Sequence, residues 1–245
     1  MLKSQQKHKA FILHRYSYQE QGFLLKIFTQ EQGLVTCIAQ YAKRPKSAWY
    51  SLLQAFQPLL IECRGQGEVS SLKQAERDGP PTYLEGDALF SGFYLNELLL
   101  SFMAPHDAHL ALYERYHQAL QSLSEGRDPI LLEKTLRIFE FALFEDLGFL
   151  PDLSHDDKGE PILPKALYQL APHHPPQRLD GGVGERLPSC FTGSDLLVLH
   201  ARQFEHPGVL KVARRFSRLA LDFYLPKSKL KTRDVFAQMH SARSA

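Results

Sequence analysis

The sequence changes character at a short run of residues that break both helices and strands, Asp-Gly-Pro-Pro at 78–81. Two consecutive prolines lack the backbone N–H that helices and central strands require, and glycine and aspartate favour turns. Before this break the apolar runs are short and β-rich, whereas after it they are long and spaced as in helices. We therefore expect two domains, one over residues 1–79 and one over residues 80–245.

The first domain is predicted to be a small β-barrel. Turn-forming residues, among them Gly33, Gly65 and Gly67, separate several of its runs. A segment at 48–55 has apolar side chains at helical spacing and fits one or two helical turns. Five strands with a short helix between the third and the fourth are the layout of an OB-fold. The expected strands are 11–14, 23–29, 34–42, 56–64 and 68–74.

The second domain is predicted to be α-helical, which makes the whole chain an α+β protein. One helix has a physical signal at each end, because Asp128 is a good cap, Pro129 suits a first turn and Gly148 suits a stop. A long insert at about 150–190 carries seven prolines between residues 151 and 189, and we expect it to be a loop. The other expected helices are 87–104, 107–124, 193–203 and 207–225, with a further one after Thr232.

Charge is segregated along the chain, although the formal net charge is only +2. Residues 1–80 hold 11 basic and 6 acidic residues, residues 81–210 hold 9 and 19, and residues 211–245 hold 9 and 2. Two basic ends thus flank an acidic middle. Local positive fields attract polyanions such as nucleic acids, although charge blocks are also found on solvated helix faces.

The three cysteines, Cys37, Cys63 and Cys190, are widely spaced and form no CxxC pair. They predict neither a disulfide framework nor a zinc site, and they suit a reducing compartment. The amino-terminal residues resemble no signal peptide, and no apolar run reaches the roughly 20 residues of a transmembrane helix. We expect a cytoplasmic protein with no membrane association.

The sequence contains none of the common catalytic signatures: no GxxxxGK[ST], no GxGxxG after a strand, no HExxH and no GxSxG. His106 and His109 have a spacing that could serve a metal, but solvated histidines at a helix start explain them better. We therefore predict no enzyme, no metal and no cofactor.

Basic and aromatic residues alternate in the segment that leaves the third expected strand. Cations on an exposed loop bind phosphates, and ring faces stack on bases without reading sequence. Alternatively, Trp49 and Tyr50 pack on the barrel while the cations are solvated. The candidate DNA-binding residues in this domain are Lys43, Arg44, Lys46 and Trp49, with Arg15 and Arg64 as further phosphate contacts.

A second candidate DNA-binding cluster lies in the last long helix. Its members are spaced by three and four residues and so share one helix face. The sequence leaves two readings open, an anion-binding face and a solvated face. The residues are Lys211, Arg214, Arg215 and Arg218.

Taken in order, several segments resemble the RecO family of bacterial recombination mediators. In the first domain these are Phe28-Thr29, Gly33-Leu34-Val35, the basic loop at 43–47, and Leu53-Gln-Ala-Phe-Gln-Pro-Leu-Leu60. In the second domain they are Leu95-Asn-Glu-Leu-Leu99, Leu136-Arg-Ile-Phe-Glu140 with Leu147-Gly148, and Arg214-Arg-Phe216 through Leu221. The resemblance spans nearly the whole chain.

This resemblance implies a non-enzymatic role in DNA repair and recombination. RecO-like proteins bind single- and double-stranded DNA and anneal complementary strands. They also act with RecR and with the acidic carboxyl-terminal tail of single-stranded-DNA-binding protein, so that RecA can be loaded. The resemblance implies a cytoplasmic, nucleoid-associated protein. Many members carry a four-cysteine zinc module after the Leu-Gly pair, but residues 149–189 of this chain contain no cysteine, so we expect no zinc module.

At the position of the family's helix arginine stands Arg137, which the resemblance suggests as the ligand for the partner tail's carboxylate. A guanidinium group can hold a carboxylate through two parallel hydrogen bonds. Leu136 and Phe139 would line an apolar pocket for the tail, or would belong to the core. Two alternatives to a mediator remain, an OB-fold nucleic-acid-processing enzyme and a protein-interaction scaffold.

Overall fold

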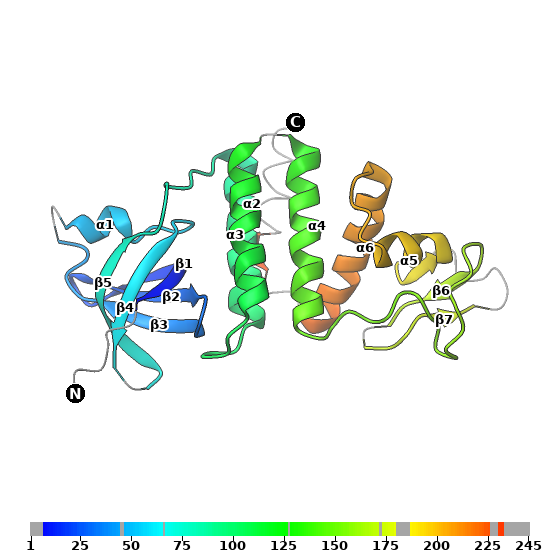
Figure 1. Ribbon diagram of the computed structural model, residues 1–245, viewed down its shortest axis with the longest axis horizontal. Helices are drawn as coiled ribbons and strands as arrows, with labels where there is room; N and C mark the ends of the chain where they lie inside the picture. The colour runs from blue at the N-terminus through cyan, green and yellow to red at the C-terminus, as the bar shows by residue number, and fades with distance from the viewer. Residues whose placement is uncertain are drawn as a thin grey trace. The chain divides into compact units, whose positions relative to one another are not determined.

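The structure is a computed structural model, and it divides the chain into two compact units (Figure 1). The first unit is formed by residues 1–127 together with residues 230–245, and the second by residues 128–229. The domain boundary that the sequence places at residue 79 stays a prediction. The structure describes residues 7–44, 47–65, 67–126, 128–171, 173–179, 187–225 and 230–232.

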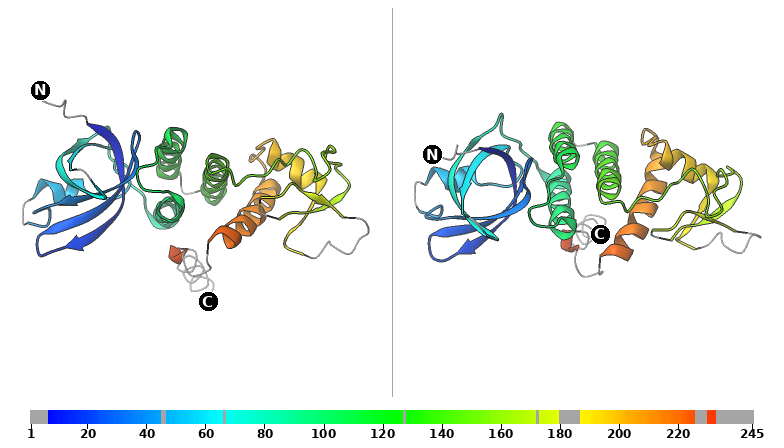
Figure 2. Two further views of the ribbon diagram at one scale, coloured as in Figure 1. Left: turned by 90° about the horizontal axis from the view of Figure 1, so that it is seen from below. Right: turned by 60° about the horizontal axis from the view of Figure 1, so that its bottom comes forward.

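The first unit begins with a closed five-stranded barrel, which confirms the predicted OB-fold. Its strands follow the order β1-β2-β3-β5-β4, and β3 and β5 pair in parallel while the other pairs are antiparallel. Figure 2 shows the strands curving round to close on themselves. The elements are β1 (His8–Tyr18), β2 (Gly22–Thr29), β3 (Gly33–Ala39), α1 (Ala48–Leu52), β4 (Leu59–Arg64) and β5 (Val69–Arg77).

Alternation along the strands fills the barrel interior with apolar side chains, because successive residues of a strand point to opposite faces. On β2, for example, Phe23, Leu25 and Ile27 point inward and belong to the buried core. On β3, Val35 and Cys37 lie opposite Ile27 and Leu25 and belong to the same core. The barrel is thus filled by its own side chains.

A bulge at Leu13 divides β1 into two halves. Ile12 pairs with Ile27 and His14 pairs with Lys26, so Leu13 is the extra residue. The sequence predicts a strand that ends at His14, and this is wrong, because the strand continues to Tyr18. The bulge inserts one residue and so interrupts the alternation from which strands are recognised.

Two helices, α2 (Gly86–Phe102) and α3 (Leu110–Glu125), follow the barrel in the same unit. Aromatic side chains join α3 to the outer face of β1 and β2. The ring of Tyr113 lies 5.5 Å from that of Phe11 and 5.4 Å from that of Phe28, measured between centroids. The helices therefore cover the half of the outer face that precedes the bulge.

Asn96 of α2 ties the bulge to the helices. Its side-chain Nδ2 donates a 2.8 Å hydrogen bond to the Leu13 carbonyl, and its Oδ1 accepts a 2.5 Å hydrogen bond from the Tyr116 hydroxyl of α3. Asn96 is 2% exposed and Tyr116 is fully buried. A single amide thus links β1, α2 and α3.

Glu97, the next residue, binds a distant part of the chain. Its carboxylate accepts hydrogen bonds from the backbone N–H groups of Lys231 (2.8 Å) and Thr232 (3.0 Å), and also from the Thr232 hydroxyl. Leu230 is buried beside them. Residues 230–232 therefore belong with the first unit, although they follow the whole second unit in the sequence.

The second unit contains three helices and a small sheet of order β7-β6-β8 among its described residues. Phe141 of α4 packs with Phe204 and with Phe216 of α6 at its centre. The insert, predicted to be a loop, contains β6 and β7, which are too short to show a periodicity. The elements are α4 (Pro129–Asp146), β6 (Leu167–Gln169), β7 (Gln177–Arg178), β8 (Cys190–Thr192), α5 (Gly193–His200) and α6 (Pro207–Tyr224).

None of the helices in the described part of the chain combines the length and the apolar content needed to cross a bilayer.

Candidate nucleic-acid interface

The basic loop after β3 is fastened to the turn between β1 and β2. The Lys43 backbone N–H donates a 2.9 Å hydrogen bond to the Gln21 carbonyl, and Arg44 Nε donates a 2.7 Å hydrogen bond to Gln21 Oε1. Tyr41 turns the chain into this loop with a φ of 59°, in the left-handed region. The loop cations are consequently held at one end of the barrel.

Aromatic rings lie beneath these cations. Lys43 Nζ is 5.3 Å from the centre of the Phe23 ring, and the Arg44 guanidinium carbon is 3.8 Å from that of Tyr41. The Arg15 guanidinium carbon approaches Phe23 as well, at 4.9 Å. We call Arg15, Lys43 and Arg44 the loop cation cluster.

Arg15 has a structural role within this cluster. Its Nη1 donates to the Leu53 carbonyl at 3.3 Å and to the Tyr50 carbonyl at 3.5 Å, and its guanidinium carbon lies 5.4 Å from the centre of the Tyr50 ring. These carbonyls lie at the end of α1, where helical hydrogen bonds run out. Arg15 therefore holds α1 on the barrel and is only partly exposed.

The remaining predicted residues of this domain are Trp49, Arg64 and Lys46. Trp49 is partly buried and packs against the barrel core, while its neighbour Tyr50 is 52% exposed. Arg64 is exposed at the end of β4, where it pairs with Ser71 of β5. Lys46 lies outside the described residues.

Two of the four basic residues predicted on α6 form ion pairs with carboxylates of neighbouring helices. Arg214 Nη2 lies 2.6 Å from Glu133 Oε1 of α4, and Arg215 Nη2 lies 3.4 Å from Asp195 Oδ2 of α5. Lys211 and Arg218 are exposed on the same helix. The spacing of the four residues could not show this pairing, because the carboxylates come from distant parts of the sequence.

Arg137 lies on α4 and is only 7% exposed. Its Nη2 lies 2.9 Å from Oε1 of Glu140, which is fully buried, and its Nε has no hydrogen-bond partner among the described residues. Phe139 is 1% exposed, whereas Leu136 is partly buried. The arginine is therefore held beside a carboxylate of its own helix.

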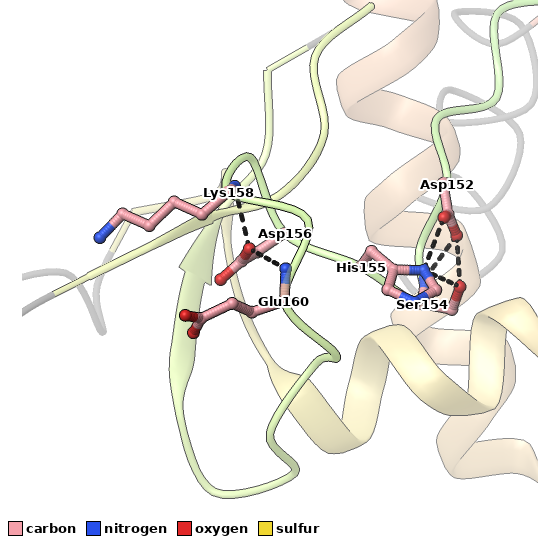
Figure 3. Close-up of polar contacts among 6 residues, drawn as sticks. All are labelled: Asp152, Ser154, His155, Asp156, Lys158 and Glu160. Carbon is pink, nitrogen blue, oxygen red and sulfur yellow. Dashed lines mark hydrogen bonds and ion pairs between the residues drawn. The ribbon is translucent and has the colours of Figure 1, made fainter.

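A serine, a histidine and an aspartate meet in the insert, but not as a catalytic triad (Figure 3). Ser154 Oγ donates to Asp152 Oδ1 at 2.6 Å and lies 3.0 Å from His155 Nδ1. The same Nδ1 lies 3.0 Å from Asp152 Oδ2. A triad needs the two ring nitrogens of its histidine to serve different partners. Hydrogen bonds from Ser154, reinforced by His155, lower the pKa of Asp152 to about 2.

Asp156, also in Figure 3, is a structural carboxylate. It is 4% exposed, and its Oδ1 accepts hydrogen bonds from the backbone N–H groups of Lys158 (3.0 Å) and Glu160 (2.9 Å). It therefore holds a tight turn within the insert. Among the residues that the structure describes, no group of three or more His, Cys, Asp or Glu side chains could hold a metal ion.

Two thiols face each other inside the barrel. The Sγ atoms of Cys37 and Cys63 are 2.7 Å apart, and both cysteines are free. The hydrogen bond from Cys37 lowers the pKa of Cys63, and the same contact, together with burial, raises the pKa of Cys37. No local pattern in the sequence indicates this pair, because its members are 26 residues apart.

Comparison with known proteins places both halves of the chain in one family. Residues 1–78 match the model described as "Recombination protein O N terminal", and residues 84–234 match "Recombination protein O C terminal". The DNA repair protein RecO of Dechloromonas aromatica is 36% identical over 230 residues, which cover 94% of each chain. The DNA repair protein RecO of Stutzerimonas stutzeri is 38% identical over 230 residues, which cover 94% of this chain and 93% of that protein.

Proposed function

The chain belongs to the RecO family of DNA repair proteins, and from this premise we propose that it is a recombination mediator without catalytic activity. It binds single- and double-stranded DNA and anneals complementary strands. With RecR and single-stranded-DNA-binding protein, it assists the loading of RecA on DNA at the nucleoid in the cytoplasm.

The loop cation cluster is the observation that supports this proposal most directly. Lys43 and Arg44 are fastened to the barrel through Gln21, and each lies over an aromatic ring. Fixed cations neutralise phosphates at a smaller cost in side-chain entropy than mobile ones do. OB-folds bind single strands with this combination of positive charge and rings.

A salt titration tests the phosphate contacts. Replacing both cations in a Lys43→Ala/Arg44→Ala variant should lower the slope of log affinity against log salt by about 1.4 on single-stranded DNA, because each lost contact removes about 0.7. Fluorescence anisotropy with a labelled oligonucleotide measures the slope. A Lys158→Ala/Lys165→Ala variant removes two exposed lysines of the second unit and is the matched control. An unchanged slope in the first variant would contradict the proposed role of the loop.

DNA incubated with the protein and Mg²⁺ distinguishes the mediator from a nucleic-acid-processing enzyme. The mediator leaves the strands intact and accelerates the annealing of complementary oligonucleotides. Cleavage would contradict the non-enzymatic assignment.

Arg137 is the proposed ligand for the carboxylate of an acidic partner tail, with Leu136 and Phe139 beside it. Its buried Nε supports the proposal, because a donor without a hydrogen bond gains free energy when a carboxylate reaches it. Binding of a labelled acidic peptide that ends in phenylalanine should weaken strongly in Arg137→Ala and partly in Arg137→Lys, which keeps the charge but loses the fork. Arg214→Ala serves as the control. Equal peptide affinity in Arg137→Ala and the wild type would rule the assignment out.

A further inference from the structure

The two thiols inside the barrel come from strands that are not neighbours in the sheet. Cys37 lies on β3 and pairs with Ser70 of β5. Cys63 lies on β4 and pairs with Leu72 of the same strand. Residues two apart on a strand point to one face, and for β5 this is the face of Leu72, which belongs to the barrel core. Both cysteines therefore lie beside the inner face of β5, one on each side of it.

Closure of the barrel brings the two sulfurs together. Strands that flank a third strand in a flat sheet lie roughly 10 Å apart. In the closed barrel the Sγ atoms of Cys37 and Cys63 are 2.7 Å apart. A disulfide joins its sulfurs at about 2.05 Å, so these two atoms need to approach by less than about 1 Å. A small adjustment of the two side chains is enough to bond them.

The two cysteines differ in their access to solvent. Cys37 is 0% exposed, whereas Cys63 is partly exposed and precedes the exposed Arg64. The hydrogen bond from Cys37 also lowers the pKa of Cys63, which favours the reactive thiolate. An oxidant in solution therefore reaches Cys63 first, while Cys37 is in contact with it on the inner side. Redox-sensitive cysteines commonly have such a resolving cysteine beside them.

We propose that Cys37 and Cys63 form a reversible disulfide when hydrogen peroxide oxidises the protein. The Cys63 thiolate attacks one peroxide oxygen and the O–O bond breaks. This gives a sulfenic acid on Cys63 and a hydroxide, which takes up the proton that the thiol had released and becomes water. The Cys37 sulfur then attacks the Cys63 sulfur and the S–O bond breaks. The leaving hydroxide takes the Cys37 proton and forms a second water.

Electrons balance in this sequence, because the two sulfurs together lose two electrons and the peroxide gains them. A dithiol reductant reverses the reaction by thiol–disulfide exchange. Cys190 takes no part, since it is buried and belongs to the second unit. The inference goes beyond the proposed function and does not depend on DNA binding.

The disulfide closes a ring of chain that includes the basic loop. Lys43, Arg44 and α1 all lie between the two cysteines in the sequence. A cross-link of this kind removes conformational freedom from the unfolded chain. The oxidised barrel should therefore resist unfolding better than the reduced barrel.

Thiol counting and peptide mapping on the full chain test the proposal. The reduced protein, freed of reductant, is treated with hydrogen peroxide, and its thiols are then counted in denaturant. The count should fall from three to one, because two of the three cysteines become joined, and dithiothreitol should restore it. Trypsin releases Cys37 in the peptide 27–43 and Cys63 in the peptide 47–64. The linked pair of peptides therefore has a mass of its own, which disappears on reduction.

Single substitutions separate the roles of the two thiols. Cys37→Ser removes the resolving thiol, so Cys63 should be oxidised further, to the sulfinic acid. Cys63→Ser removes the exposed thiol, and Cys37 should stay reduced. Cys190→Ala is the matched control and should form the linked peptides as the wild type does.

Urea unfolding tests whether the bond fits the barrel. Fluorescence of Trp49, which lies inside the closed ring, reports the transition. The midpoint should be higher for the oxidised than for the reduced wild type. Peroxide should leave the midpoint of Cys63→Ser unchanged, which controls for oxidation elsewhere in the chain.

The proposal is overturned if peroxide leaves three thiols, or if the linked peptides include the one with Cys190. It is overturned equally if Cys63 of the wild type reaches the sulfinic acid without linked peptides, or if oxidation leaves the wild-type midpoint unchanged or lowers it. None of these measurements involves a nucleic acid, so a failure of the proposed DNA binding would not affect them.

Discussion

Single residues of the barrel have chemical properties that only their neighbours explain. Cys63 is a partly exposed thiol whose pKa is lowered by the hydrogen bond from Cys37, whereas Cys37 and Cys190 are buried. Because the thiolate is the nucleophile, a lowered pKa makes a cysteine reactive at lower pH. The three cysteines should therefore differ in reactivity.

We expect iodoacetamide to label Cys63 first, with an onset below the pH at which an ordinary cysteine reacts. Removing the donor in Cys37→Ala should move the onset to higher pH, and Cys37→Ser should leave it low because serine can still donate. Mass spectrometry of labelled peptides across a pH series measures the onset. Labelling of Cys190 before Cys63, or an onset that is the same in Cys37→Ala, would contradict this account.

Arginines show why the sequence predicts site residues incompletely. The spacing of Arg214 and Arg215 placed them correctly on α6, but Glu133 and Asp195, which lie close to them, come from other helices. Arg15 was expected to contact phosphate, and its contacts with α1 carbonyls depend on a fold that no short motif encodes. Residue type and spacing show where charged side chains lie along the sequence. Tertiary contacts decide which of these side chains can still contact a ligand.

At the scale of elements, the long helices were the most predictable part. Expected helices at 87–104 and 207–225 are found at Gly86–Phe102 and Pro207–Tyr224. Their apolar side chains recur at helical spacing over many turns, and a proline or a glycine stands at or near each end. Strands β6 and β7, with three and two residues, carry no comparable signal. The bulge in β1 concealed half of that strand for a different reason, because the extra residue interrupts the alternation of side chains.

The link between that bulge and the two helices makes a stability prediction. Asn96→Ala removes the hydrogen bond to the Leu13 carbonyl and the one from Tyr116, and should lower the free energy of unfolding by about 2–4 kcal/mol, because buried polar groups lose their partners. Tyr116→Phe removes one of these bonds and should cost about 1 kcal/mol. Urea unfolding followed by fluorescence of Trp49, the single tryptophan, measures both.

Gln118→Ala, at an exposed position of α3, provides the control and should change the free energy by less than about 0.5 kcal/mol. If Asn96→Ala were as stable as this control, Asn96 would not be the link that the hydrogen bonds indicate.

At the scale of the whole molecule, the sequence predicted an OB-fold followed by helices, and both are present. It also predicted the family, because the resemblance extends over nearly the whole chain. It did not predict that residues 230–232 rejoin the first unit, since that connection depends on Glu97, more than 130 residues earlier. Long-range hydrogen bonds of this kind leave no local pattern.

Leu230→Ala should therefore weaken the first unit. A buried leucine contributes about 2–5 kcal/mol relative to alanine, so the amides of α2 should exchange with deuterium faster in this variant. Amides of β6 and β8, in the second unit, should keep their protection. Lys231→Ala, at an exposed neighbouring position, should exchange like the wild type. Unchanged exchange in α2 of Leu230→Ala would show that residues 230–232 do not support the first unit.

The contact between Glu97 and residues 231–232 also has a consequence for protein synthesis. Chains emerge from the ribosome in sequence order, and domains commonly fold as they emerge. The barrel with α2 and α3 can form early. Glu97 can bond Lys231 and Thr232 only after the entire second unit has been translated. A nascent chain stalled within the second unit thus carries a first unit in which Glu97 has not yet formed its hydrogen bonds to residues 231 and 232.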